Sequence, residues 1–131
     1  MTFTVLGTPA PQGSKRHVGH GIMVESSKKV GPWRDSVAWA ARAAMESDGI
    51  AQFTGPVELT INFYLSRGKT VKRRYPTTPP DLDKLMRSTC DGITSSGLWR
   101  DDSQVVHSSI RKMYAAAGKL PGAFIIVMEA E

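Results

Sequence analysis

The hydrophobic pattern of the chain is most regular in residues 57–65, where apolar side chains occupy every second position. The apolar members are Val57, Leu59, Ile61, Phe63 and Leu65, and more polar residues separate them. Strict alternation over this length predicts a β-strand with one buried face. Shorter apolar patterns predict further strands at residues 2–6, 104–112 and 123–129.

Two segments have helical periodicity instead. Residues 32–45 begin with Pro32, which is tolerated at the start of a helix, and place Trp33, Val37 and several alanines on one side. We interpret Trp33 and Trp39 as packing residues, and the alanines as a close contact with a sheet or a partner subunit.

The second predicted helix lies between Pro80 and Gly97. Two prolines cannot extend it backwards, so Asp81 is the predicted N-cap, and Gly97 is a typical left-handed stop. The buried stripe is predicted to contain Leu82, Leu85, Met86, Thr89, Cys90 and Ile93. The element order is therefore β-α-β-α-β-β. It predicts one α+β domain over residues 1–131, with two helices packed on a mixed or antiparallel sheet.

Residues 8–31 are predicted to form a long flexible basic loop, with a short hairpin around residues 19–21. Its cations are Lys15, Arg16, Lys28 and Lys29. Loops of this length are usually functional or disordered. A mobile arm that contacts DNA and a solvated connection both remain open interpretations.

Composition narrows the class of protein. A net charge of +5 and a pI near 9.6 favour a partner that carries phosphates. The single cysteine, Cys90, excludes an internal disulfide and suits a reducing cytoplasm. The longest apolar run, residues 123–128, is too short to span a membrane. We expect a cytoplasmic protein without membrane contact.

Against this basic background, four aspartates bracket the second helix: Asp81, Asp83, Asp101 and Asp102. Helical spacing places Asp83, Arg87 and Asp91 on one ridge. An ordinary cap and a solvated face would explain the first pair alone. A tight return after Gly97 would bring the second pair beside the helix start, and clustered carboxylates repel unless a cation lies among them. Hard oxygen ligands suit Mg²⁺ or Mn²⁺ rather than zinc.

A basic run precedes this helix and carries five positive charges: Arg67, Lys69, Lys72, Arg73 and Arg74. A charge run is usually a solvated face, but this position favours a clamp for phosphates. The Gly68-Lys69-Thr70 triplet lacks the upstream glycine and the following helix of a P-loop. No nucleotide cofactor is expected.

The residues Asp81-Leu82-Asp83, Asp91 and the run from Gly97 to Val106 resemble the RusA family of Holliday junction resolvases, often encoded by phages or prophages. The resemblance implies a Mg²⁺-dependent homodimer that nicks four-way DNA junctions symmetrically in recombination and repair. It implies that Asp81, Asp83 and Asp102 bind the metal, with Asp101 a further candidate. The family usually has an essential lysine where this chain has Arg87, so Lys84 or Arg87 would supply that cation.

Two other functions remain open. One is a metal nuclease for other branched DNA or for plain duplex, which shares the site. The other is a non-catalytic DNA-binding protein, which would bind with a steep salt dependence but need no divalent ion. A phosphatase for small molecules is disfavoured by the excess of positive charge.

Overall fold

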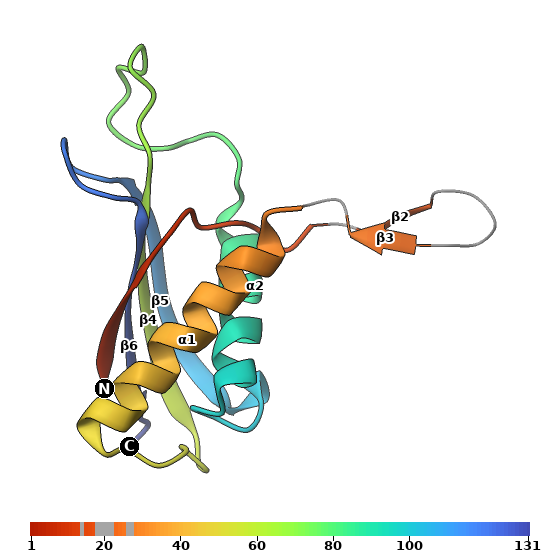
Figure 1. Ribbon diagram of the computed structural model, residues 1–131, viewed down its shortest axis with the longest axis vertical. Helices are drawn as coiled ribbons and strands as arrows, with labels where there is room; N and C mark the ends of the chain where they lie inside the picture. The colour runs from red at the N-terminus through yellow and green to blue at the C-terminus, as the bar shows by residue number, and fades with distance from the viewer. Residues whose placement is uncertain (14, 18–22, 26–27) are drawn as a thin grey trace.

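The computed structural model describes residues 1–13, 15–17, 23–25 and 28–131 (Figure 1). Its strands are β1 (Thr2–Leu6), β2 (Lys15–His17), β3 (Met23–Glu25), β4 (Val57–Leu65), β5 (Val105–Tyr114) and β6 (Gly122–Glu129). The helices are α1 (Val30–Asp48) and α2 (Leu82–Ser96), followed by the short 3₁₀ helix η1 (Asp102–Gln104). The α+β class and the predicted order of the main elements are confirmed, whereas η1 was not predicted.

The main sheet has the strand order β1-β6-β4-β5. β6 pairs antiparallel with both β1 and β4, whereas β4 and β5 are parallel. Parallel neighbours need a crossover connection, and α2 supplies it here. Because of this crossover, α2 and β5 run in opposite directions. The start of α2 therefore lies near the end of β5.

Both helices cover the same face of the sheet (Figure 1). The predicted alternation of β4 is confirmed, because Val57, Leu59, Ile61 and Phe63 are fully buried under these helices. β1 and β6 add Phe3, Val5, Ile125 and Val127 to the same core. This two-layer arrangement fixes α2, and the residues that follow it, against β5.

α1 and α2 pack closely on each other. A Cβ atom added at Gly92 would lie 2.8 Å from both the Arg34 carbonyl oxygen and the Val37 Cβ, so only glycine fits there. The buried Trp33 donates a 3.0 Å hydrogen bond from Nε1 to Thr89 Oγ1. The prediction for Trp33 is confirmed, but that for Trp39 is wrong, because Trp39 lies on the outer side of α1 and is 71% exposed.

The ends of α2 agree with the sequence analysis. Asp81 is the N-cap residue, with an extended backbone, and Gly97 ends the helix with a left-handed φ of 83°. The buried residues Leu85, Thr89, Cys90 and Ile93 follow the predicted stripe. Asp83 and Arg87, on the polar side of α2, line a cavity beside β5.

β2 and β3 form a separate antiparallel hairpin between β1 and α1 (Figure 1). These strands flank the predicted turn at residues 19–21, which itself lies outside the described residues. The side chains of Lys15 and Arg16 are likewise not described. Neither α1 nor α2 combines the length and the hydropathy that a membrane crossing requires.

Candidate active site

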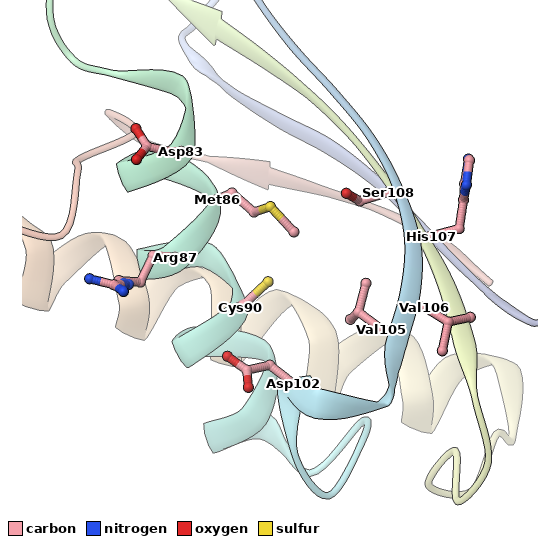
Figure 2. Close-up of a pocket in the computed structure, with 9 residues that line it drawn as sticks. All are labelled: Asp83, Met86, Arg87, Cys90, Asp102, Val105, Val106, His107 and Ser108. Carbon is pink, nitrogen blue, oxygen red and sulfur yellow. The ribbon is translucent and has the colours of Figure 1, made fainter.

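A cavity of about 470 Å³ lies between α2 and the first half of β5 (Figure 2). Its polar lining includes Asp83 and Arg87 from α2, Asp102 from η1, and His107 and Ser108 from β5. Met86, Cys90, Val105 and Val106 complete it. Two acids that lie 19 positions apart in the sequence thus line one cavity.

The helical spacing of α2 explains its share of this cavity. Asp83 and Arg87 are one turn apart and form the polar ridge that the sequence predicts. Both side chains are exposed, whereas Leu85, on the opposite side of the helix, is fully buried in the core. The cavity therefore has an acidic group and a basic group anchored on one rigid element.

The second acidic pair divides into two different roles. Asp101 is the N-cap of η1, and its carboxylate accepts hydrogen bonds from the hydroxyl and the backbone N–H of Ser103. These hydrogen bonds, above all the one from the Ser103 hydroxyl, lower the pKa of the Asp101 carboxyl group. Only the neighbouring Asp102 lines the cavity.

Gln104 holds this acidic turn in place. Its Oε1 accepts hydrogen bonds from the backbone N–H groups of Arg100 and Asp101, at 2.8 and 3.0 Å. Its Nε2 donates to the carbonyl oxygens of Phe53 and Gly55, both at 2.9 Å. One side chain thus ties the turn to a segment about fifty residues earlier and fixes where Asp102 lies.

Asp102 lies beside Cys90 in the second half of α2 (Figure 2). The expected return of the second acidic pair to the helix start is therefore wrong, because η1 follows the C-terminal end of a helix that runs opposite to β5. Seven residues separate Asp83 from Cys90, or about 10 Å along the helix axis. Burial, followed by the negative charges of Asp102 and Asp91, raises the pKa of the Cys90 thiol to about 12. Cys90 is therefore a neutral thiol, as its buried position predicts, rather than a nucleophile.

Asp81 stands at the helix start and does not line this cavity. Its carboxylate lies 3.8 Å from the Nζ atom of Lys84, in an exposed ion pair. Within the described residues, no three acidic, histidine or cysteine side chains lie close enough together to form a complete metal site. Of the two candidate cations, Arg87 lines the cavity and Lys84 pairs with Asp81.

The sequence analysis missed Lys112. This residue of β5 donates hydrogen bonds from Nζ to the carbonyl oxygens of Thr78 and Pro80, at 3.0 and 2.8 Å. It therefore holds the segment that leads directly into Asp81. A lysine on a strand gives no sequence signal for this role, because its partners belong to a loop more than thirty residues away.

The predicted basic run lies in the loop between β4 and α2. Arg67 donates hydrogen bonds to the carbonyl oxygens of Val71 and Arg73, so the loop is folded back on itself. Arg67 and Arg73 both lie over the ring of Tyr114, at 5.4 and 5.9 Å from its centre. The run is therefore an ordered structure beside the end of β5. Lys28 and Lys29 are exposed at the start of α1.

Two carboxylates and an arginine line one cavity of a basic α+β chain, an arrangement that is typical of nucleases. The chain belongs to the RusA family of endodeoxyribonucleases: the family model described as "Endodeoxyribonuclease RusA" matches residues 7–128. It is 31% identical over 111 residues to the crossover junction endodeoxyribonuclease RusA of Escherichia coli strain K12, covering 84% of this chain and 82% of the relative. The RusA protein of Enterobacteria phage 82 is 30% identical over the same shares. The uncharacterized protein YqaN of Bacillus subtilis strain 168 is 29% identical over 88% of each chain.

Proposed function

We propose that this chain is a Mg²⁺-dependent endodeoxyribonuclease that resolves four-way DNA junctions by paired symmetric nicks, acting as a homodimer in recombination and repair. The observation that carries the proposal is the single cavity that Asp83, Arg87 and Asp102 line together in a basic chain of the RusA family. The curated relatives named above as crossover junction endodeoxyribonucleases support the choice of substrate.

The carboxylate oxygens that line the cavity are donors of the type that a hard divalent cation prefers. Mg²⁺ in enzymes typically takes one or two carboxylates, and water and substrate phosphate complete its coordination. Asp83 and Asp102 supply two carboxylates, both exposed enough to exchange ligands with solvent. Asp81, two positions before Asp83, is the third member of the proposed set. Mn²⁺ prefers the same oxygen donors and is expected to substitute.

The residues of the cavity divide the work of phosphodiester hydrolysis. A bound Mg²⁺ ion would activate water and offset the charge that develops on the phosphate. Arg87 adds a positive charge to the same cavity, where it can bind a phosphate oxygen and stabilise the transition state. We assign Lys84 to Asp81, because its ammonium group holds that carboxylate at the helix start.

The basic segments would bind the DNA backbone. Lys15, Arg16, Lys28 and Lys29 belong to the N-terminal segment, and the loop after β4 carries the cations at positions 67, 69, 72, 73 and 74. Such contacts position DNA without reading its sequence. Specificity for a branched substrate would then come from simultaneous backbone contacts with several arms of the junction.

A direct test compares a labelled four-way junction with a plain duplex, each incubated with Mg²⁺ or with EDTA. We expect the junction alone to be cut, only with Mg²⁺, and at symmetric positions when each strand is labelled in turn. Cutting of the duplex or of flaps with equal efficiency would identify a nuclease of different substrate range. Binding of the junction without cutting under any divalent ion would identify a DNA-binding protein instead.

The proposed homodimer is tested separately by light scattering on the purified chain. A dimer would have twice the 14.3 kDa mass of one chain. Because each subunit would cut one strand, a mixture of wild-type and Asp102→Asn chains should produce junctions with one nick. Paired nicks in one binding event by a protein that stays monomeric would contradict the dimer.

A further inference from the structure

A second cavity, of about 620 Å³, lies at the opposite end of β5 from Asp102. Its walls are the loop after β4, from residue 66 to residue 74, and the turn between β5 and β6, residues 115–119. Both segments emerge beyond the same end of the sheet, because β4 and β5 are parallel and Leu65 pairs with Tyr114 (Figure 1). We call it the Tyr114 cavity, after the last residue of β5, which also lines it.

The Tyr114 cavity is lined by cations from both walls. Arg67, Lys69 and Arg74 come from the loop, and Lys119 comes from the turn. No acidic residue is among the described residues that line it. The turn contributes only alanines and Gly118 beside Lys119, so small side chains leave the space between the cations open. Sequence spacing gives no reason to group Lys119 with a loop that lies about fifty residues earlier.

Arg67, one of the lining cations, is held in place before any ligand binds. Arg67 hydrogen-bonds to two carbonyl oxygens of its own loop and lies over the Tyr114 ring. The neighbouring Arg73, which does not line the cavity, also lies over this ring and donates a hydrogen bond to Thr78 Oγ1. These contacts use only part of the N–H donors of each guanidinium group. A site of this kind loses little conformational entropy when an anion binds.

We propose that the Tyr114 cavity binds backbone phosphates of a DNA arm at a fixed distance from the cut, a proposal that rests on the function proposed above. Nine residue steps separate Val105, beside Asp102, from Tyr114. At about 3.3 Å for each residue of a strand, the two ends are roughly 30 Å apart. Duplex DNA rises about 3.4 Å for each base pair. On a DNA arm that lies parallel to β5, the phosphates that the cavity contacts are therefore about nine base pairs from the position of Asp102.

This distance makes the proposal testable with junctions of two arm lengths. One junction has arms of about seven base pairs, and the other has arms of about sixteen. These lengths are shorter and longer than the roughly nine base pairs that span the length of β5. Each arm is closed by a hairpin loop, so that the short junction stays assembled. Binding is measured in EDTA over a range of salt concentrations, which separates it from cleavage.

Lys119→Ala is the test variant, and Arg111→Ala is the matched control. Both residues are exposed cations, but only Lys119 lines the cavity. On the long junction, we expect Lys119→Ala to reduce the slope of log affinity against log salt by about one, the effect of one lost phosphate contact. On the short junction, the slope should equal that of the wild type. Arg111→Ala should leave the slope on both junctions equal to that of the wild type.

An unchanged slope for Lys119→Ala on the long junction would overturn the proposal, as would the same change on both junctions. Thermal unfolding of the variant checks that the turn still folds. Failure of the proposed function would be distinct, because it concerns cleavage with Mg²⁺. A chain that binds the long junction as expected but never cuts would retain the Tyr114 cavity and lose the active site.

Discussion

Lys112 on β5 donates a 2.8 Å hydrogen bond from Nζ to the carbonyl oxygen of Pro80, the residue that precedes Asp81. A second hydrogen bond, of 3.0 Å, reaches the carbonyl oxygen of Thr78. The end of β5 thus fixes the segment that leads into α2. Through that segment, one lysine outside the cavity controls where the first two aspartates of the proposed site lie.

Lys112→Met should therefore weaken Mg²⁺ binding more than it weakens DNA binding. The variant keeps most of the aliphatic stem but loses both hydrogen bonds to the loop. We expect the Mg²⁺ concentration for half-maximal cleavage to rise on the order of tenfold, the effect of about 1.4 kcal/mol. Junction binding in EDTA should stay within about twofold of the wild type. Arg111→Met, on the same strand and exposed, is the control, and a Lys112→Met enzyme with normal Mg²⁺ dependence would refute the role.

Asp101 and Asp102 are adjacent, but their substitutions should have opposite effects. Asp102→Asn removes a cavity carboxylate, so cleavage should be lost while the unfolding temperature stays the same. Asp101→Ala removes the cap of η1, so the unfolding temperature should fall by a few degrees, while cleavage well below that temperature persists. Cleavage assays and thermal unfolding separate the two. Loss of cleavage in a folded Asp101→Asn chain would place Asp101 among the metal ligands.

The stability effect of Asp101→Ala should also depend on pH. Hydrogen bonds from Ser103 lower the pKa of this carboxyl group below its ordinary value. The folded chain therefore favours the charged form, and this contribution to stability is fully present above pH 4, the ordinary range for aspartate. It is lost as the pH falls through the lowered pKa. The difference in unfolding temperature between wild type and variant should shrink as the pH falls below about 4.

Substitutions of Arg87 and Lys84 test which of these two residues supplies the positive charge of the proposed site. If the cavity needs a positive charge, Arg87→Met should slow single-turnover cleavage on the order of a hundredfold, whereas Arg87→Lys should retain most of it. Lys84→Met removes only an exposed ion pair, which typically contributes less than about 1 kcal/mol. Its effect should be small. The reverse order, with Lys84→Met the slow variant, would transfer the role from Arg87 to Lys84.

Local patterns in the sequence were enough to predict the elements. The alternation in residues 57–65 determines both the strand and its buried face, and Asp81 and Gly97 mark the ends of α2 through local backbone chemistry. Asp83 and Arg87 could be placed on one ridge for the same reason, because their spacing is that of a helical turn. Each of these features depends on neighbours within a few residues.

Features that depend on distant partners could not be predicted. The position of Asp102 is set by Gln104, whose side chain bonds to Phe53 and Gly55. The pairing of β4 with β5, and the reach of Lys112 to Pro80, likewise depend on how the whole chain folds. Trp39 was misassigned because residue type alone suggests burial. Its angular position on α1 places it on the solvent side.

Cys90 allows a test of the packing around α2. Burial, together with Asp102 and Asp91, raises the pKa of its thiol from 9.0 to about 12, so the folded chain keeps the proton while the unfolded chain releases it above pH 9. The stability that this preference contributes is fully present below pH 9 and is lost as the pH rises toward 12. The slope of that loss approaches about 1.4 kcal/mol for each pH unit.

Cys90→Ala should lack this component of the pH dependence. Its unfolding free energy is expected to be lower at pH 8, because a buried side chain is truncated, and to fall less steeply than that of the wild type between pH 9 and 10.5. Urea unfolding of both chains in EDTA measures the difference, and the other titrating groups contribute equally to the two curves. Parallel curves across this range would mean that the thiol ionises as easily in the folded chain as in the unfolded one. The packing of α2 against β5 would then be looser than the buried position of Cys90 requires.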